Sequence, residues 1–235
     1  MGRSKDIASG SKFVDTTGDT MTGALIGTSA GFTGDVNIGN NDSSNPLTKL
    51  RLGGTQYGAT DIRPTDEGGH KVGMAFYTDG TGDTTIDPVL RMTIDSSGRV
   101  TMPNQPSFSA HRDAGHVSAG NVFVFDHTNY NIGNMYNTSN GKATVPVDGR
   151  YFLSVWLMTN NQNAWNNKYF RIRINNVSPA YRNVYSSNGG NYHHQISWAG
   201  VIDLNANDFV EIYIDNFEAY GSNSLYSNFS MHLLS

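Results

Sequence analysis

Short alternating segments that end at glycine, aspartate or asparagine constrain this chain of 235 residues more than any other feature. In residues 1–100 they read "ALIG", "FTGDVNIG", "KLRLGG", "VGMAFYTDGTGD" and "VLRMTIDSSGRVTM". Runs of about four to eight alternating residues that stop at such turn residues are typical of β-strands and hairpins. We find no segment with the helical period. The pattern therefore predicts an all-β chain.

Residues 104–235 contain longer segments of the same kind. They read "NVFVFD", "RYFLSVWLMT", "YFRIRIN", "HQISWAGVIDL", "FVEIYID" and "YSNFSMHLL", and this part of the chain holds all three Trp and ten of the twelve Tyr. Several strands joined by polar turns predict an antiparallel β-sandwich or jelly roll. In "FVEIYID" the alternation assigns Val210, Ile212 and Ile214 to one face and Glu211, Tyr213 and Asp215 to the other.

Three domains are expected. Residues 1–44 are interpreted as a flexible segment for attachment, residues 45–103 as a short-stranded fibrous shaft, and residues 104–235 as a compact head, with Pro103 and Pro106 near the second boundary. The first hundred residues hold 17 of the 26 Gly. One copy of this part has too few apolar residues to offset its ordering entropy, which predicts that it intertwines with identical copies.

Composition argues against several classes of function. A net charge of -4 argues against nucleic-acid binding, and the absence of Cys excludes disulfides and Cys-ligated zinc. No apolar run approaches the roughly 18 residues of a membrane span, so no membrane insertion is expected. The opening segment "MGRSKDIASGSKF" lacks the apolar stretch of a secretory signal.

Candidate catalytic and metal motifs are weak. Neither a nucleophile elbow nor a His-centred triad spacing is present, and Glu218 is the clearest acid in the loops discussed below, so we expect no enzyme and no cofactor. His193, His194 and His232 could gather a metal, but scattered histidines are commoner, and no metal site is predicted. "DGTGD" (79–83) and "DLNAND" (203–208) resemble parts of calcium loops and are better interpreted as turns.

Four segments of the head carry a family resemblance: "FSAHRD", "FDHTNYNIGNMYNTSNGKATVPVDGRYFLS", "IDLNANDFVEIYI" and "YSNFSMHLLS". In this order they resemble the C1q globular-head domain of the tumour-necrosis-factor-like superfamily. The matching positions are Asn131, Gly133, Tyr136, Gly149, Tyr151, Leu204, Asp208, Val210, Phe229, Ser230, Leu233 and Leu234. Leu153 stands where the family has Phe, and Asn207 and Met231 stand where it has Gly. The resemblance implies a C1q-like jelly roll, a homotrimer, and a last strand that runs inside a sheet beside the first.

The first half resembles a different group. "TTGDTMTGALIG" and "GMAFYT…LRMTIDSSGRVTM" are similar to modules of bacteriophage tail fibres, particularly those of marine cyanobacterial phages. This resemblance implies a virion location, in the tail, and contacts with other virion tail proteins through the N-terminus. The residues expected to make these contacts are Arg3, Lys5, Lys12 and Phe13.

Three long polar segments are the candidate binding site. In an antiparallel sandwich, successive loops alternate between the two ends, so residues 159–167, 186–193 and 216–225 should share one end and the short turns at 175–179 and 204–208 the other. Asn-rich loops with isolated aromatic rings suit glycan contact. The residues predicted to bind a receptor are Asn163, Trp165, Asn188, Tyr192, His193, Tyr220 and Asn223. An equally open alternative is that the rings fill gaps at subunit contacts.

Three functions are compatible with these features. The first is a phage tail fibre whose trimeric head recognises a host cell-surface glycan or protein. The second is a structural virion fibre or decoration protein whose head drives trimerisation. The third, a tailspike-like glycan depolymerase, needs two carboxylates that sequence cannot place.

Overall fold

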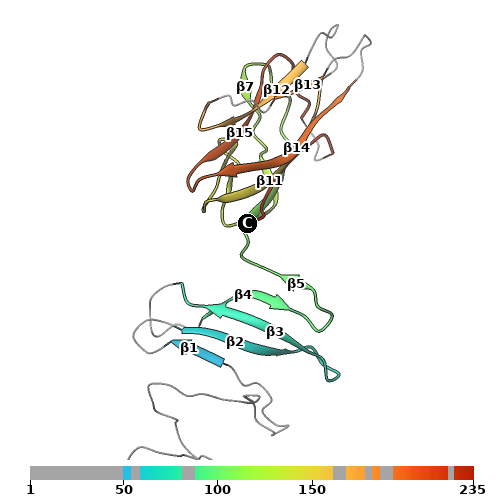
Figure 1. The fold of residues 1–235 in the computed structure, drawn as a ribbon. Helices are drawn as coiled ribbons and strands as arrows, with labels where there is room; N and C mark the ends of the chain where they lie inside the picture. The colour runs from blue at the N-terminus through green and yellow to red at the C-terminus, as the bar shows by residue number, and fades with distance from the viewer. Residues whose placement is uncertain are drawn as a thin grey trace, which may run out of the picture. The chain divides into compact units, whose positions relative to one another are not determined.

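The computed structural model of the chain describes residues 50–53, 59–80, 88–160, 168–177, 182–185, 193–221 and 225–235. All of them belong to the second of two compact units, Leu47–Ser235, the first being Met1–Pro46. Every regular element in the described ranges is a β-strand, which confirms the all-β prediction for this part of the chain (Figure 1). The described residues include no helix of the length and apolar character that a membrane crossing requires.

One sheet is formed by the strands nearest the N-terminus. Its antiparallel strands follow one another in chain order: β1 (Leu50–Gly53), β2 (Ala59–Asp66), β3 (Val72–Thr78), β4 (Val89–Ile94) and β5 (Val100–Thr101). β1, β3, β4 and β5 fall within "KLRLGG", "VGMAFYTDGTGD" and "VLRMTIDSSGRVTM", as predicted. "ALIG" and "FTGDVNIG" lie outside the described residues.

The segment that forms β2 was not singled out in the sequence, and it contains a proline. Pro64 cannot donate a ladder hydrogen bond and normally demotes a run to an edge strand or a non-strand. Here β2 pairs with β1 only up to Ile62 in the described residues, while its pairing with β3 continues through Pro64. Pro64 therefore keeps its place in the ladder between β2 and β3, where it lies opposite Met74.

One face of this sheet carries exposed apolar side chains. Met74 lies directly opposite Ile94, which in turn lies opposite Val100, so the three form a row across β3, β4 and β5. Met74 is 45% exposed and Val100 54% exposed. The row is consistent with the expectation that one copy of this part of the chain leaves apolar surface uncovered.

The head consists of two further sheets packed face to face. The first has the order β13-β12-β15-β10-β9, with β7 also paired to β15, and the second has the order β14-β11-β16-β6-β8. Their bounds are β6 (Ser107–His111), β7 (Asn121–Val122), β8 (His127–Ile132), β9 (Tyr136–Asn137), β10 (Lys142–Thr144), β11 (Gly149–Met158), β12 (Lys168–Ile174), β13 (Arg182–Tyr185), β14 (Gln195–Leu204), β15 (Phe209–Ile214) and β16 (Ser227–Leu233). Buried side chains from both sheets form a single core.

The last strand lies in the middle of its sheet. β16 pairs antiparallel with β11 on one side and with β6, the first strand of the head, on the other, which confirms the predicted placement. Phe229 and Met231 point into the core and are fully buried, whereas Ser230 and His232 point outward. Phe229 contacts the ring of Phe108 edge-on, at a centroid distance of 4.9 Å.

A side-chain clamp explains why the Asn-x-Gly-x-x-Tyr segment has these residue types. The Asn131 side chain accepts a hydrogen bond from the Tyr136 amide (3.1 Å) and donates one to the Tyr136 carbonyl (2.8 Å). Gly133 has a φ of 79°, in the left-handed region that glycine adopts without strain. The Tyr136 ring stacks on Phe108 in the core, and burial raises the pKa of its hydroxyl. The segment thus closes a turn and at the same time fixes the Tyr136 ring in the core.

The family's glycine position at Asn207 has a similar explanation. Asn207 has a φ of 72° in the turn that joins β14 to β15. Asparagine is the residue besides glycine that most readily enters the left-handed region, so it satisfies the same backbone requirement. The Asp208 carboxylate accepts a hydrogen bond from the Asn205 amide (2.9 Å), which confirms the interpretation of "DLNAND" as a turn.

Two details of the strands differ from the sequence prediction. Val210, Ile212 and Ile214 face the core as expected, but Glu211 on the other face is also buried, because its carboxylate is paired with Arg173. In "NVFVFD" only β7 is a strand, and Phe123, after it, still donates a backbone hydrogen bond to Ile212. A hydrophobic pattern does not reveal a salt bridge that covers a polar face.

Truncating the central ring of β16 should destabilise the head. Phe229→Ala removes a fully buried side chain and should lower the free energy of unfolding by about 3–5 kcal/mol. Leu234→Ala, at an exposed position five residues later, should change it by less than about 0.5 kcal/mol. Urea denaturation followed by tryptophan fluorescence measures both. Equal, small effects of the two substitutions would contradict the central position of β16.

Candidate binding site

Three connections of the head meet at one end of the sandwich. They follow β11, β13 and β15, and their described residues are joined by backbone hydrogen bonds. The Thr159 amide donates to His194 (2.8 Å), the Asn160 amide donates to Glu218 (2.8 Å), and the Tyr220 amide donates to Met158 (2.7 Å). The described parts of the segments 159–167, 186–193 and 216–225 therefore lie side by side, as the alternation of loops predicts.

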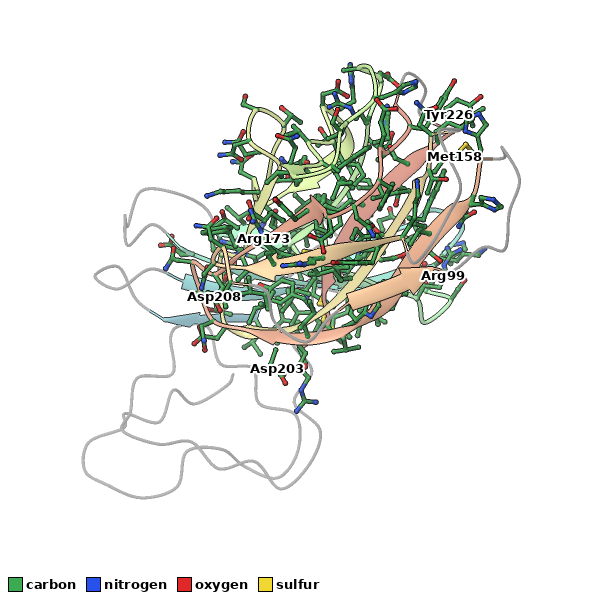
Figure 2. All side chains as sticks on the ribbon, turned by 90° about the horizontal axis from the view of Figure 1, so that it is seen from above. Arg99, Met158, Arg173, Asp203, Asp208 and Tyr226 are labelled. Carbon is green, nitrogen blue, oxygen red and sulfur yellow. The ribbon has the colours of Figure 1, made fainter. Side chains whose placement is uncertain are left out.

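The opposite end holds the entry and the exit of the head. The Leu233 amide donates to the carbonyl of Pro106 (3.0 Å), and the Arg150 amide donates to the carbonyl of Ser235 (2.9 Å). The short turns are there too, joined by the hydrogen bond from the Asn175 side chain to Asp208 (2.7 Å). Figure 2 shows Met158 and Tyr226 together, away from Asp203 and Asp208.

Tyr220 lies at the centre of a ring cluster at the end where the long connections meet. Its ring contacts His116 (4.4 Å between centroids), His193 (4.9 Å) and Tyr226 (4.7 Å). His116 comes from the connection between β6 and β7, and its Nδ1 accepts a hydrogen bond from the Gly221 amide (3.1 Å). We name these four residues the ring cluster. Tyr220 is half-buried, and His193 is exposed.

The structure thus brings together two of the residues predicted to bind a receptor, His193 and Tyr220. Asn163, Trp165, Asn188, Tyr192 and Asn223 lie outside the described residues, as do the predicted attachment residues Arg3, Lys5, Lys12 and Phe13. His116 and Tyr226 were missed, because neither lies in the part of a long loop that composition singled out. Only their contacts with Tyr220 in the structure identify His116 and Tyr226 as part of the candidate site.

Two charged groups also lie at this end. The Glu218 carboxylate accepts a hydrogen bond from the Asn160 side chain, so it links two of the connections. Lys168, the first residue of β12, is buried, and burial lowers the pKa of its ammonium group to about 8.

The histidines that might have gathered one metal are separated. His232 lies opposite Ser107, near the entry of the head, and its Nε2 is 3.2 Å from the hydroxyl of Tyr130. His193 instead belongs to the ring cluster, where its Nδ1 is 2.9 Å from the Thr159 carbonyl. The two histidines therefore lie at opposite ends of the sandwich.

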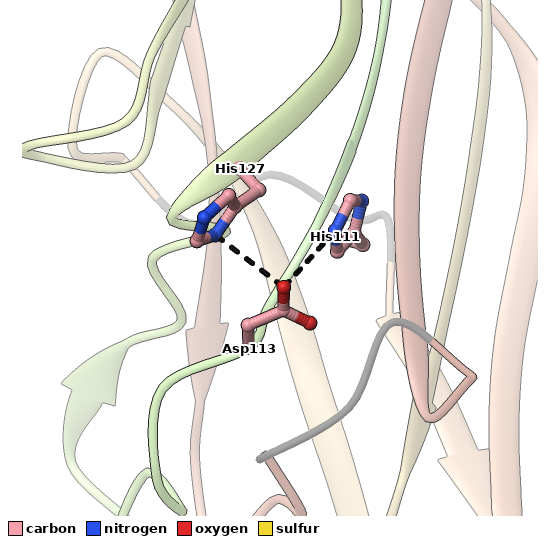
Figure 3. Close-up of side chains that lie close together, drawn as sticks. All are labelled: His111, Asp113 and His127. Atoms are coloured by element: carbon pink, nitrogen blue, oxygen red, sulfur yellow. Dashed lines mark ion pairs between the residues drawn. The ribbon is translucent and has the colours of Figure 1, made fainter.

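A different group of side chains was missed in the sequence. His111, Asp113 and His127 place one nitrogen or oxygen atom each within 4.8 Å of one another (Figure 3). Nearby, burial alone would raise the pKa of Asp126, yet hydrogen bonds from the Asp113 amide, from His127 and from the Ala114 amide hold it below its usual value. No sequence signal pointed to this group, since its spacing matches no common metal motif.

The match to a family model decides the family. A model described as the C1q domain matches residues 107–234, the range from the first strand of the head almost to its last residue. The chain belongs to the C1q domain family. The C1q domain of this chain therefore accounts for both sheets of the sandwich, and the departures at Leu153, Asn207 and Met231 are variations within the family.

Solved structures similar to the chain have low sequence identity. The globular domain of zebrafish complement 1qA protein is 17% identical, with a TM-score of 0.44, over 56% of this chain and 98% of that one. Eiger TNF from S. frugiperda is 10% identical, with a TM-score of 0.48, over 56% and 94%. Murine APRIL is 12% identical, with a TM-score of 0.46, over 55% and 99%. No curated protein matches the chain.

The ring cluster should stabilise the end of the C1q domain where the long connections meet. Tyr220→Ala removes three ring contacts, each of which typically contributes about 0.5–1.5 kcal/mol, so we expect the free energy of unfolding to fall by about 1–3 kcal/mol. Tyr220→Phe keeps the ring and should stay close to the wild-type value. Urea denaturation compares the two variants. A Tyr220→Ala protein as stable as the wild type would show that the cluster does not hold the connections together.

Proposed function

We propose that this chain is a trimeric bacteriophage tail fibre whose C1q domain binds a receptor on the host surface, a glycan or a protein. The observation that carries the proposal is the meeting of three long connections at one end of the sandwich, opposite Pro106 and Ser235. Chain entry at one end leaves the other end free for a ligand. Loops held by a rigid sandwich are a common place for binding residues.

Two exposed surfaces support a homotrimer. The first is the row of Met74, Ile94 and Val100 described above. The second is the outer face of the sheet β14-β11-β16-β6-β8, where Val201 lies directly opposite Phe152 and both are exposed. A second and third copy of the chain would cover both surfaces. The resemblance to C1q heads implies the same arrangement, with three jelly rolls around an axis.

The virion location rests on the first half of the chain. "TTGDTMTGALIG" and "GMAFYT…LRMTIDSSGRVTM" resemble tail-fibre modules, and they precede the C1q domain at residues 107–234. Residues 1–44, with Arg3, Lys5, Lys12 and Phe13, would then dock onto other tail proteins. Electron microscopy of virions labelled at Ser235 tests this part of the proposal, because the label should lie at a fibre end, away from the tail.

A purely structural fibre or decoration protein is the second candidate. The observation that favours it is the ring cluster, in which Tyr220 uses its ring for contacts within its own chain. If Trp165 and Tyr192 do the same, the connections would shape the head and bind nothing. The two functions differ in the effect of substituting these rings: a receptor-binding head loses binding to host cells, whereas a structural head does not.

Trimer assembly should depend on the outer face of the second sheet. The wild type should sediment at three times the chain mass of 25.6 kDa. Val201→Glu places a carboxylate on the outer face at a position that is 51% exposed in one chain, and burying it without a partner at a subunit contact is unfavourable. We expect this variant to sediment as a monomer.

The matched control is Val177→Glu, at a 66% exposed position in the turn after β12, which should remain trimeric. A wild-type protein that sediments as a folded monomer would contradict the trimer. A trimeric Val201→Glu protein would contradict the choice of this face.

Receptor binding should depend on the aromatic rings of the long connections. Trp165→Ala and Tyr192→Ala should each weaken binding of the labelled trimer to host cells about tenfold, because a ring buried by a ligand contributes more than about 1 kcal/mol. The loss should be larger in combination, since three copies bind together. A panel of marine cyanobacterial strains, chosen because of the tail-fibre resemblance, supplies the cells.

Val177→Ala, at the opposite end of the sandwich, is the control and should bind like the wild type. Normal trimers of both ring variants with unchanged binding would support the structural fibre. Release of soluble sugar from the cells by the wild type would instead identify a depolymerase.

A further inference from the structure

A cluster of two imidazoles and one carboxylate lies on the sheet that contains β16. His111 ends β6, His127 begins the neighbouring edge strand β8, and Asp113 belongs to the connection that follows β6 (Figure 3). All three side chains come from one chain. None of them belongs to the ring cluster or to the predicted receptor residues.

A β-bulge creates the histidine pair. The register between β6 and β8 runs regularly from Ser107 to Ser109 and shifts by one residue before Ala110. The shift leaves Asn129 with no residue opposite it on β6 and places His127 directly opposite His111. The unshifted register would place Thr128 opposite His111. Bulges recur beside functional sites, where they redirect a side chain. The irregularity in the strand is therefore what brings the two imidazoles together.

The loop that carries Asp113 is held in place. The Asp126 carboxylate accepts hydrogen bonds from the Asp113 amide (2.8 Å) and from the Ala114 amide (2.9 Å). The Arg112 side chain donates to the carbonyls of Val124 (2.7 Å) and Gly115 (2.8 Å). These contacts fix the backbone on both sides of Asp113, so its side chain is presented toward the two imidazoles at little entropic cost.

The distances between the three side chains are close to those of groups that bind one shared ion. Asp113 Oδ2 is 3.6 Å from Nε2 of His111 and 3.8 Å from Nδ1 of His127. Ligand atoms about 2.0–2.2 Å from a tetrahedral zinc ion lie about 3.4 Å from one another, so the two distances to Asp113 need to shorten by only a few tenths of an ångström. The three ligand atoms lie within 4.8 Å of one another, so the two ring nitrogens must approach each other further. The two rings are stacked at 15°, and convergence on one ion requires one of them to turn. His127 is 58% exposed and has room to turn, whereas His111 is 14% exposed. Turning His127 would exchange the present contact of its Nδ1 with Asp126 Oδ1 (3.2 Å) for the ion.

The donor set selects the class of metal. Calcium and magnesium prefer sites made of oxygen ligands, while two imidazole nitrogens suit zinc, copper, nickel or iron. We propose that His111, Asp113 and His127 form a binding site for a divalent transition-metal ion of the zinc class. The ion ties the end of β6 to the edge strand β8, and solvent completes its coordination.

Titration calorimetry of the full-length protein with zinc chloride tests the site. The wild type should bind one zinc ion per chain at this site, and this binding should weaken when a proposed ligand is replaced. Asp113→Asn and His127→Asn should each lower the zinc affinity more than about 100-fold, because even the loss of a group that only supports a ligand costs about 10–100-fold. Asp113 is 44% exposed and His127 58% exposed, so both variants should fold, which their melting in EDTA verifies.

Matched controls are Asp203→Asn and His70→Asn, which change the same residue types at exposed positions elsewhere and should bind zinc like the wild type. Calcium chloride should neither bind at this site nor displace zinc. Cobalt(II) offers a second readout, since imidazole coordination changes its visible absorption, and this change should be absent in Asp113→Asn. A wild type without zinc binding, or zinc binding equal in wild type, Asp113→Asn and His127→Asn, would overturn the proposal.

Discussion

The burial of β16 between β11 and β6 is the interaction on which the rest of the C1q domain depends. It brings the last residues of the chain beside the first strand of the head, with Phe229 and Met231 in the core. This contact joins residues more than a hundred positions apart, and without β16 both β6 and β11 would lose a strand partner. The first and last strands of the C1q domain therefore pair with each other inside one sheet.

That closure also decides where a ligand could bind. With Pro106 and Ser235 at one end, the antiparallel order places the connections after β11, β13 and β15 at the other. The ring cluster and the Asn160–Glu218 contact then join these connections to one another. A set of loops supported in this way can present side chains in a fixed arrangement, which reduces the entropy that a ligand must overcome.

Parts of this arrangement were predictable from the residues. Alternation in "FVEIYID" and "YSNFSMHLL" indicated which side chains face the core, and counting loops indicated which connections share an end. Other parts were not. Glu211 is buried because Arg173, on the neighbouring strand, covers it, and β2 is a strand although it contains Pro64. Both depend on a partner strand that a local pattern does not contain.

By itself, the sequence determined the all-β class, the faces of the head strands and the C1q family motifs, since these follow from local alternation and from turn residues such as Gly133 and Asn207. Only the tertiary structure decided which distant side chains meet: Tyr220 with His116, and His111 with Asp113 and His127. The physical reason is register. Without the one-residue shift at Asn129, His111 would lie opposite Thr128 instead of His127, and this bulge depends on the pairing of β8 with β6, which the local pattern of either strand does not contain.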